Sequence, residues 1–344
     1  MKNLKILFYS LALAVAPALS FGGAFRNPFF ESAGVVRENI DALDSVVTAH
    51  ADSALNELDA KAKRTWLDSG YINHHQSLRQ GLGYDGDTFS LAVGTDHNYS
   101  KQCPFLDKFL DSYAVGAFAA YNNTSVDYKG AETLGGDKTK NSSLAFGLYS
   151  GYGSKRWSIF SLSLFSAERY KHSLSMHSGA DLSGALAKVD THTFRGNSVH
   201  SNVKISYKCL CKQLTIEPEA TLLYGKIGQK KHGDGTLSLA KQRMEYLQAI
   251  FGVKLGMTAN VGTHRIKPQL FVGLARDVHR RDKIAETQAP IAQTIFERGR
   301  GSAVVKASLS LLINGTMDAD ISYRGEYFKH NQAHALIAGI SYKF

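Results

Sequence analysis

The last twelve residues of the chain, 333–344, constrain its fold more than any other stretch. Apolar side chains alternate there with small or polar ones up to the final residue, and a period of two is the signature of a β-strand. One face of this strand would carry Leu336, Ala338, Ile340, Tyr342 and Phe344. A strand that ends on an aromatic residue needs a partner for its backbone. A closed antiparallel barrel in lipid supplies that partner, because its last strand pairs with its first.

The N-terminal segment has the composition of a secretory signal peptide. Two basic residues, Lys2 and Lys5, precede an apolar run over residues 6–16, and small residues follow up to Ser20. This pattern predicts a signal peptide over residues 1–20 with cleavage near Ser20. The run is shorter than the roughly 20 residues that a transmembrane helix requires. A membrane location would therefore depend on strands.

Composition and charge agree with a barrel. The chain has 344 residues, of which 44% are hydrophobic, and its mean hydropathy is −0.19. These values are too polar for a helical membrane protein but suit a barrel with a wet interior. Removal of Lys2 and Lys5 would leave 38 basic and 30 acidic residues, a formal charge of +8. Because the signal directs the chain out of the cytoplasm, we exclude nucleic acid as a partner.

A helical pattern follows the signal. Residues 21–34 form a short segment rich in Gly and Phe without a period, whereas apolar residues from Val36 to Leu58 recur at spacings of three and four. The pattern predicts a helix and linker over residues 35–62 that could lie in a barrel pore. An acidic solvated helix face or a coiled-coil stalk would fit the same pattern.

Alternating segments between residues 63 and 344 predict an all-β, twelve-stranded antiparallel transmembrane barrel. The apolar residues of one parity were assigned to the lipid face, among them Phe160, Leu162 and Leu164. Tight connections are expected at residues 153–156, 209–212, 261–265 and 314–315, and long ones at 122–141, 167–197, 225–244 and 276–301. Long loops outside and short turns inside are usual in the outer membrane, so we expect extracellular loops and a periplasmic C terminus.

Three stretches resemble the autotransporter β-domain, the translocator of type V secretion. They are GLYSGY at 147–152 followed by Trp157, IEPEATLLY at 216–224 and GISYKF at 339–344. The resemblance covers residues 64–344 and implies a bacterial outer-membrane barrel with an α-helix threaded through its lumen. It also implies insertion by the barrel-assembly machinery, periplasmic chaperones as partners, and delivery of an N-terminal passenger to the cell surface.

Two features depart from that family. About fourteen residues separate the signal from the helix, so residues 21–34 are interpreted as a vestigial passenger, and the helix lacks the Asn-Asn pair at which some members cut themselves. The alternative is a stand-alone surface adhesin or porin-like barrel that acts through its loops.

Charged residues at inward positions suggest a task for the helix. The helix is acidic, and the inward parity of the strands carries charges of both signs. We expect the helix to contact these charges and to plug the pore. The positions are Lys204, Lys254, Lys306 and Arg324, with Glu217, Glu219, Asp320 and Glu326.

The C-terminal strand is expected to serve as the signal that the assembly machinery reads through strand pairing, with Phe344, Tyr342 and Ile340 as anchors. A disulfide is expected between Cys103 and either Cys209 or Cys211 at the periplasmic rim.

No catalytic, cofactor or metal site is expected. His74, His75 and His279 lack partners at metal spacing, and the Asp and His residues of the last hairpin form no recognisable catalytic motif. The segment 225–244 is basic and could meet lipopolysaccharide phosphates or acidic host glycans, although a solvated basic loop is the simpler explanation.

Overall fold

A computed structural model describes residues 28–55, 63–79, 82–99, 112–129, 137–154, 156–176, 188–211, 214–230, 232–233, 238–239, 241–262, 264–284, 300–313 and 316–344. The expected signal peptide, residues 21–27 and Cys103 lie outside these ranges.

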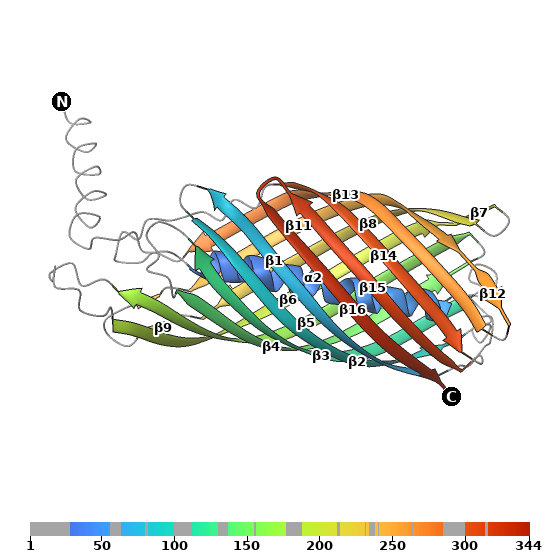
Figure 1. Ribbon diagram of the computed structural model, residues 1–344, viewed down its shortest axis with the longest axis horizontal. Coiled ribbons are helices and arrows are strands. Elements are labelled where there is room, and N and C mark those ends of the chain that lie inside the picture. The colour runs from blue at the N-terminus through green and yellow to red at the C-terminus, as the bar shows by residue number, and fades with distance from the viewer. Residues whose placement is uncertain are drawn as a thin grey trace, which may run out of the picture.

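Twelve long antiparallel strands form a closed barrel, which confirms the predicted fold (Figure 1). Each long strand pairs with the next one in the chain, and the first pairs with the last. The long strands are β1 Lys63–Arg79, β2 Leu82–Asn98, β3 Ser112–Lys129, β4 Lys138–Gly153, β5 Trp157–Met176, β6 Lys188–Tyr207, β8 Leu214–Gln229, β11 Gln242–Met257, β13 His264–Ile284, β14 Gly301–Ile313, β15 Met317–Phe328 and β16 Asn331–Lys343. Short pieces are β7 Cys209–Cys211, β9 His232–Gly233, β10 Ser238–Leu239 and β12 Ala259–Val261.

The seam between β1 and β16 closes the barrel. Its register runs from Arg64 opposite Lys343 to Gln76 opposite Asn331. The last backbone N–H, that of Phe344, donates to the carbonyl oxygen of Lys63 at 3.0 Å. The terminal strand is thus paired on both sides, by β15 and by β1, and has no free edge.

The two strand faces follow the predicted parity on β16 and most other strands. Leu336, Ile340 and Phe344 point away from the lumen and are 53%, 49% and 66% exposed. The assignment for β5 is wrong, because Phe160, Leu162 and Leu164 are buried inside the barrel. They belong to the same apolar cluster as the central helix, so here the apolar inner face reflects helix packing instead of lipid contact.

A single described helix, α2 (Pro28–Leu55), runs through the lumen along the barrel (Figure 1). It begins before the expected residue 35 and its described part ends at Leu55. Of the side chains from Ala33 to Thr48, all but Ser45 are buried. Within the described ranges, no helix combines the length and apolar character needed to cross a membrane.

Aromatic rings lie flat against the inner wall where glycine faces them. A Cβ at Gly94 would lie 2.2 Å from the Trp66 ring, and one at Gly116 would lie 2.1 Å from the Tyr149 ring. Glycine at these two positions therefore lets a large ring occupy the wall, which leaves the centre of the lumen to the helix.

The strands extend well beyond their lipid-facing apolar residues, so the long connections are shorter than predicted. Residues 122–129, 167–176 and 276–284 are strand instead of loop. The apolar outward pattern stops where the wall leaves the hydrocarbon, whereas backbone pairing continues above it.

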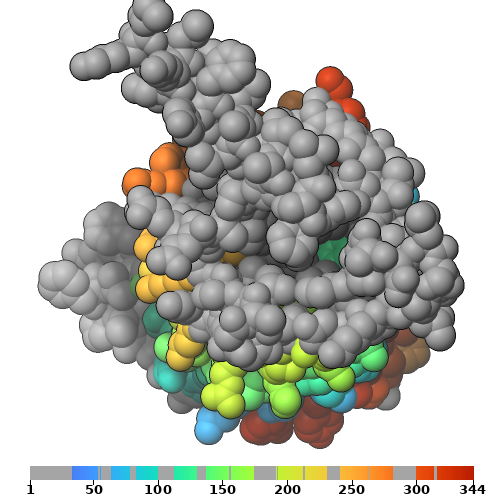
Figure 2. Space-filling model, turned by 90° about the vertical axis from the view of Figure 1, so that its left-hand side faces the viewer, coloured from blue at the N-terminus to red at the C-terminus, as the bar shows by residue number. Residues whose placement is uncertain are grey.

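The helix has a defined polarity in the barrel. The hydroxyl of Ser112, beside the tight connection after Gly153, donates to the carbonyl oxygen of Leu55 at 3.1 Å. The other end of the helix meets Asp277, near the end of β13 that leads to the 285–299 connection. The helix therefore begins at the end of the barrel with the long connections, the end that faces the viewer in Figure 2.

Candidate functional site: the helix-filled lumen

The two sides of the lumen contact α2 differently. We call β16 and β1 to β5 the near wall and β6 to β15 the far wall, and the backbone of α2 lies closest to β2, β3 and β4 of the near wall. The helix contacts the far wall through four charged residues that lie at helical spacing, Arg37, Asp41, Asp44 and Asp52. These residues form a charged stripe.

Arg37 and Asp277 make a fully buried ion pair between this stripe and the far wall. The Arg37 guanidinium donates to both carboxylate oxygens, at 2.9 and 2.6 Å, and each side chain is 1% exposed. The guanidinium also lies 3.9 Å from the centre of the Tyr246 ring on β11. Bidentate pairing together with a cation–π contact fixes both the position and the rotation of the helix at this end.

Arg324 on β15 contacts the middle of the helix. It donates to the carbonyl oxygen of Asp41 at 3.0 Å and to the Ser45 hydroxyl at 2.8 Å. Glu326, also on β15, accepts from the same guanidinium at 2.9 Å. Glu326 thus orients the Arg324 guanidinium that binds the helix.

Asp52 meets two lysines of the far wall. Lys204 Nζ lies 2.7 Å and Lys254 Nζ 3.2 Å from Asp52 Oδ2. Glu217 and Glu219 lie 3.0 and 2.9 Å from Lys254 Nζ. From the helix outward, the charges alternate in sign from the aspartate to the lysines and then to the glutamates. Each charge removed from bulk water therefore faces an opposite charge.

The near wall uses smaller polar groups. Glu38 accepts from His74 Nδ1 at 2.5 Å and from the Asn331 amide at 3.1 Å. Asn39 donates to the Thr124 hydroxyl at 3.0 Å. His74, which has no partner at metal-binding spacing in the sequence, is fully buried against the helix.

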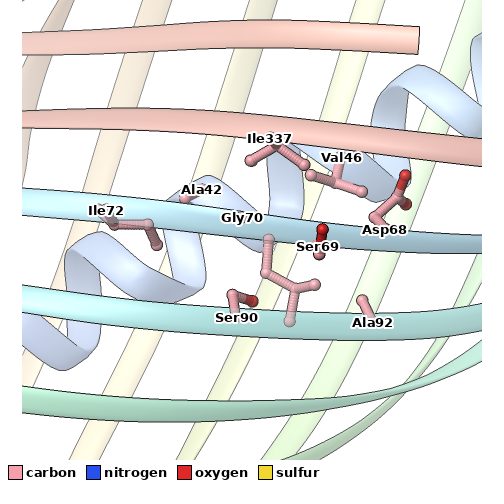
Figure 3. Close-up of a pocket in the computed structure, with 10 residues that line it drawn as sticks. Ala42, Val46, Asp68, Ser69, Gly70, Ile72, Ser90, Ala92 and Ile337 are labelled. Carbon is pink, nitrogen blue, oxygen red and sulfur yellow. The ribbon is translucent and has the colours of Figure 1, made fainter.

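Between these contacts the near wall is apolar. A small cavity lies between the helix and strands β1, β2 and β16, lined by Ala42, Leu43 and Val46 on the helix side and by Ile72, Ala92 and Ile337 on the strands. Figure 3 shows Val46 beside Ile337 and Asp68 behind the β1 ribbon. Apart from this space, the helix and near wall share one apolar cluster.

The C-terminal part of the helix is held at the β1–β16 seam. His50 Nε2 lies 2.6 Å from Asp68 Oδ2, and the imidazole stacks on Trp66 with ring centres 4.4 Å apart. Arg64 donates to the carbonyl oxygen of His50 and lies 3.0 Å from Asp96. A cation at the carboxyl end of a helix is favourable for its dipole.

Asp320 lies beside this contact. Its carboxylate and the ligand atoms of His50 and Asp68 lie within 4.8 Å of one another, across Gly339. Because His50 and Asp68 already bond to each other, we interpret the group as a contact between helix and wall.

Among the described residues, the remaining sequence candidates form no hydrogen bond or ion pair with the helix, although Lys306 is close enough to Asp44 to interact electrostatically. Lys306 Nζ lies 5.3 Å from the centre of the Phe271 ring. Ile340, Tyr342 and Phe344 are exposed on the outer wall of β16. Cys209 and Cys211 are exposed and not bonded to each other, and since Cys103 is outside the described residues the disulfide stays a prediction.

Several contacts escaped the sequence analysis. Arg37 is a single base in an acidic helical pattern, and Asp277 lies 240 positions away in a segment predicted to be a long connection. Asp68 and His74 share the inward parity of Trp66 and Ile72 on β1, a signal that could have marked them as lumen residues.

Comparisons with known proteins fit this architecture. The autotransporter beta-domain family model matches residues 66–324. The translocator domain of the autotransporter NalP from Neisseria meningitidis is 14% identical over 92% of this chain and 99% of that one, with a TM-score of 0.66. The β-domain of the Bordetella autotransporter BrkA is 14% identical over 82% and 100%, with a TM-score of 0.61. The transport unit of AIDA-I from Escherichia coli is 12% identical over 84% and 92%, with a TM-score of 0.60. At such identities the likeness establishes a shared fold. A search of curated proteins returned no match.

Proposed function

Because this chain belongs to the autotransporter β-domain family, which implies an outer-membrane location, we propose that it exports or displays its N-terminal segment at the cell surface. The polarity of α2 is the observation that carries the proposal. The helix begins at the end of the barrel that carries the long connections after β3, β5, β8 and β13, and it ends at the other, where most connections are tight. In outer-membrane barrels the long connections are extracellular. The residues before Pro28 therefore join the helix on the outer side.

The enclosed helix describes the state after export. Wall residues pair with most of its charged stripe, as at Arg37 with Asp277 and at Asp52 with Lys204, and Asp44 accepts a hydrogen bond from the Asn202 amide. Such pairing favours one register of helix against barrel, because a shift by one residue would place unpaired charges in the lumen.

Epitope accessibility on intact cells tests the proposal. One tag is inserted between residues 23 and 24, and a matched tag between Asn314 and Gly315 in the connection from β14 to β15. We expect antibody labelling of the first tag on intact cells and of the second only after permeabilisation. Labelling of the second tag alone on intact cells would reverse the orientation and overturn the proposal.

We further propose that Phe344, Tyr342 and Ile340 are read by the barrel-assembly machinery after periplasmic chaperones deliver the chain. These side chains form an exposed apolar row at the end of the last strand. Deletion of Phe344 should lower the amount of heat-modifiable barrel in outer membranes, whereas Leu270→Ala, on the outer face of β13, should leave it near the wild-type amount. Equal recovery of both variants and the wild type would refute the assembly signal.

A further inference from the structure

Four cations gather on the outer wall of the barrel, above its apolar band. They are Lys140 on β4, Arg169 and Lys171 on β5, and Arg195 on β6, and all four are exposed. We call this group the basic wall patch. The sequence analysis had placed these residues in long connections or at their borders, but they lie in regular strand with a fixed register.

Like charges face each other directly in this patch. Lys140 lies opposite Lys171 across the β4–β5 pair, and Arg169 lies opposite Arg195 across the β5–β6 pair. Directly opposed like charges destabilise an antiparallel sheet. Among the residues that the structure describes, none of the four forms an ion pair or other polar side-chain contact.

Three other cations on the same rim have acidic partners within the protein. Lys138 Nζ lies 3.0 Å from Asp127, and Lys129 pairs with Asp85. In the basic segment that the sequence analysis singled out, Arg243 lies 2.7 Å from Glu245. The four cations of the basic wall patch differ from these three in lacking an acidic partner on the wall.

The patch lies at one level on all three strands. Counting along outward positions, the last large apolar residues are Leu144, Phe165 and Val199, and the cation follows four residues further on each strand. Four residues rise about 13 Å along a strand, or about 10 Å in height at the usual tilt of such barrels. This distance reaches from the hydrocarbon edge into the headgroup layer.

The height of Arg169 above the opposite end of β5 indicates the same depth in the membrane. Trp157 is exposed, and its ring lies 4.7 Å from that of Tyr207, within an aromatic group at the end with tight connections. From Trp157 to Arg169 the strand rises about 40 Å, or about 30 Å in height, which slightly exceeds the roughly 25 Å apolar band of an outer-membrane barrel. Arg169 thus stands just above the hydrocarbon on the side opposite the aromatic group.

We propose that the basic wall patch binds the phosphate groups of lipopolysaccharide in the outer leaflet. The acyl chains would lie along the apolar outer surface of Leu144, Phe165 and Val199. Arginine suits this task because its planar guanidinium binds phosphate in a bidentate manner. The assignment rests on the orientation under Proposed function, since only the outer leaflet carries this lipid.

A binding titration with the purified full-length chain in detergent tests the proposal. The test variant carries Lys140→Gln, Arg169→Gln, Lys171→Gln and Arg195→Gln. The control carries Lys129→Gln, Lys138→Gln and Arg243→Gln, which remove cations that have acidic partners, together with Arg280→Gln to match the charge change. Heat-modifiable gel migration verifies that each barrel is folded.

We expect the test variant to bind lipopolysaccharide at least about tenfold more weakly than the wild type, and the control to change by less than about twofold. Unchanged binding by the test variant would overturn the proposal. Inorganic phosphate and phosphatidylglycerol micelles are each tested as competitors of lipopolysaccharide binding. If either competes as strongly as unlabelled lipopolysaccharide does, the patch is a general anion site and the assignment of the lipid is overturned. Antibody labelling of the N-terminal tag on intact cells that express the test variant shows whether display still occurs. This result distinguishes failure of the lipid proposal from failure of the display proposal.

Discussion

The near and far walls of the lumen hold the same helix by different forces. On the near wall, Leu43 and Val46 pack against strands β1, β2 and β16, and hydrogen bonds join Glu38 and Asn39 to neutral or imidazole partners. On the far wall, ion pairs join Arg37 and Asp52 of the helix to Asp277, Lys204 and Lys254. Apolar contact tolerates small shifts, whereas charges that must meet in pairs do not. The comparison indicates that the near wall supplies most of the adhesion and the far wall fixes the register.

The largest effect is expected on the far wall, at Arg37. Arg37→Ala leaves the buried Asp277 carboxylate without its partner, which should destabilise the docked helix by about 3–5 kcal/mol. The paired replacement Arg37→Met with Asp277→Leu should recover most of the loss, because no unpaired charge remains. A urea titration in detergent, read by protease protection of the helix, measures both. Equal stability of Arg37→Ala and the wild type would show that the pair does not hold the helix.

A smaller effect is expected on the near wall, at Leu43. Leu43→Ala enlarges the existing cavity and should cost about 2–3 kcal/mol by the same assay. Ala49→Ser, at an exposed helix position, serves as the control and should stay within about 0.5 kcal/mol. If Leu43→Ala behaved like the control, adhesion would have to come from the charges alone.

The smallest effect is expected at Asp52, which is partly accessible. Asp52→Asn weakens the pairing with Lys204 and Lys254 and should cost about 1–2 kcal/mol at low salt. The difference from the wild type should shrink at about 1 M salt, where screening acts over about 3 Å. A cost that stays constant with salt would indicate a packing role instead.

The sequence was sufficient to predict those elements whose apolar residues repeat with a regular period. Alternation in residues 333–344 predicted the closing strand, and the spacing from Val36 to Ala51 predicted the helix. Both follow from local geometry. The inward parity also identified Lys204, Lys254 and Arg324 as lumen residues, and the structure brings each of them to the helix.

What the sequence could not supply were contacts between distant elements. Arg37 meets Asp277 only because the barrel closes, and no local pattern relates the two residues. Phe160 was assigned to lipid because an apolar stripe facing a buried helix has the same alternation as one facing hydrocarbon. Parity gives two faces, and only tertiary structure tells which medium each face meets.

The central claim is that α2 fills the pore, and single-channel conductance in planar bilayers tests it most directly. The full chain is compared with a variant that lacks residues 28–55, after gel migration shows that both are folded. We expect low conductance from the full chain and a large, stable increase from the variant. Equal conductance of the two proteins would contradict the claim.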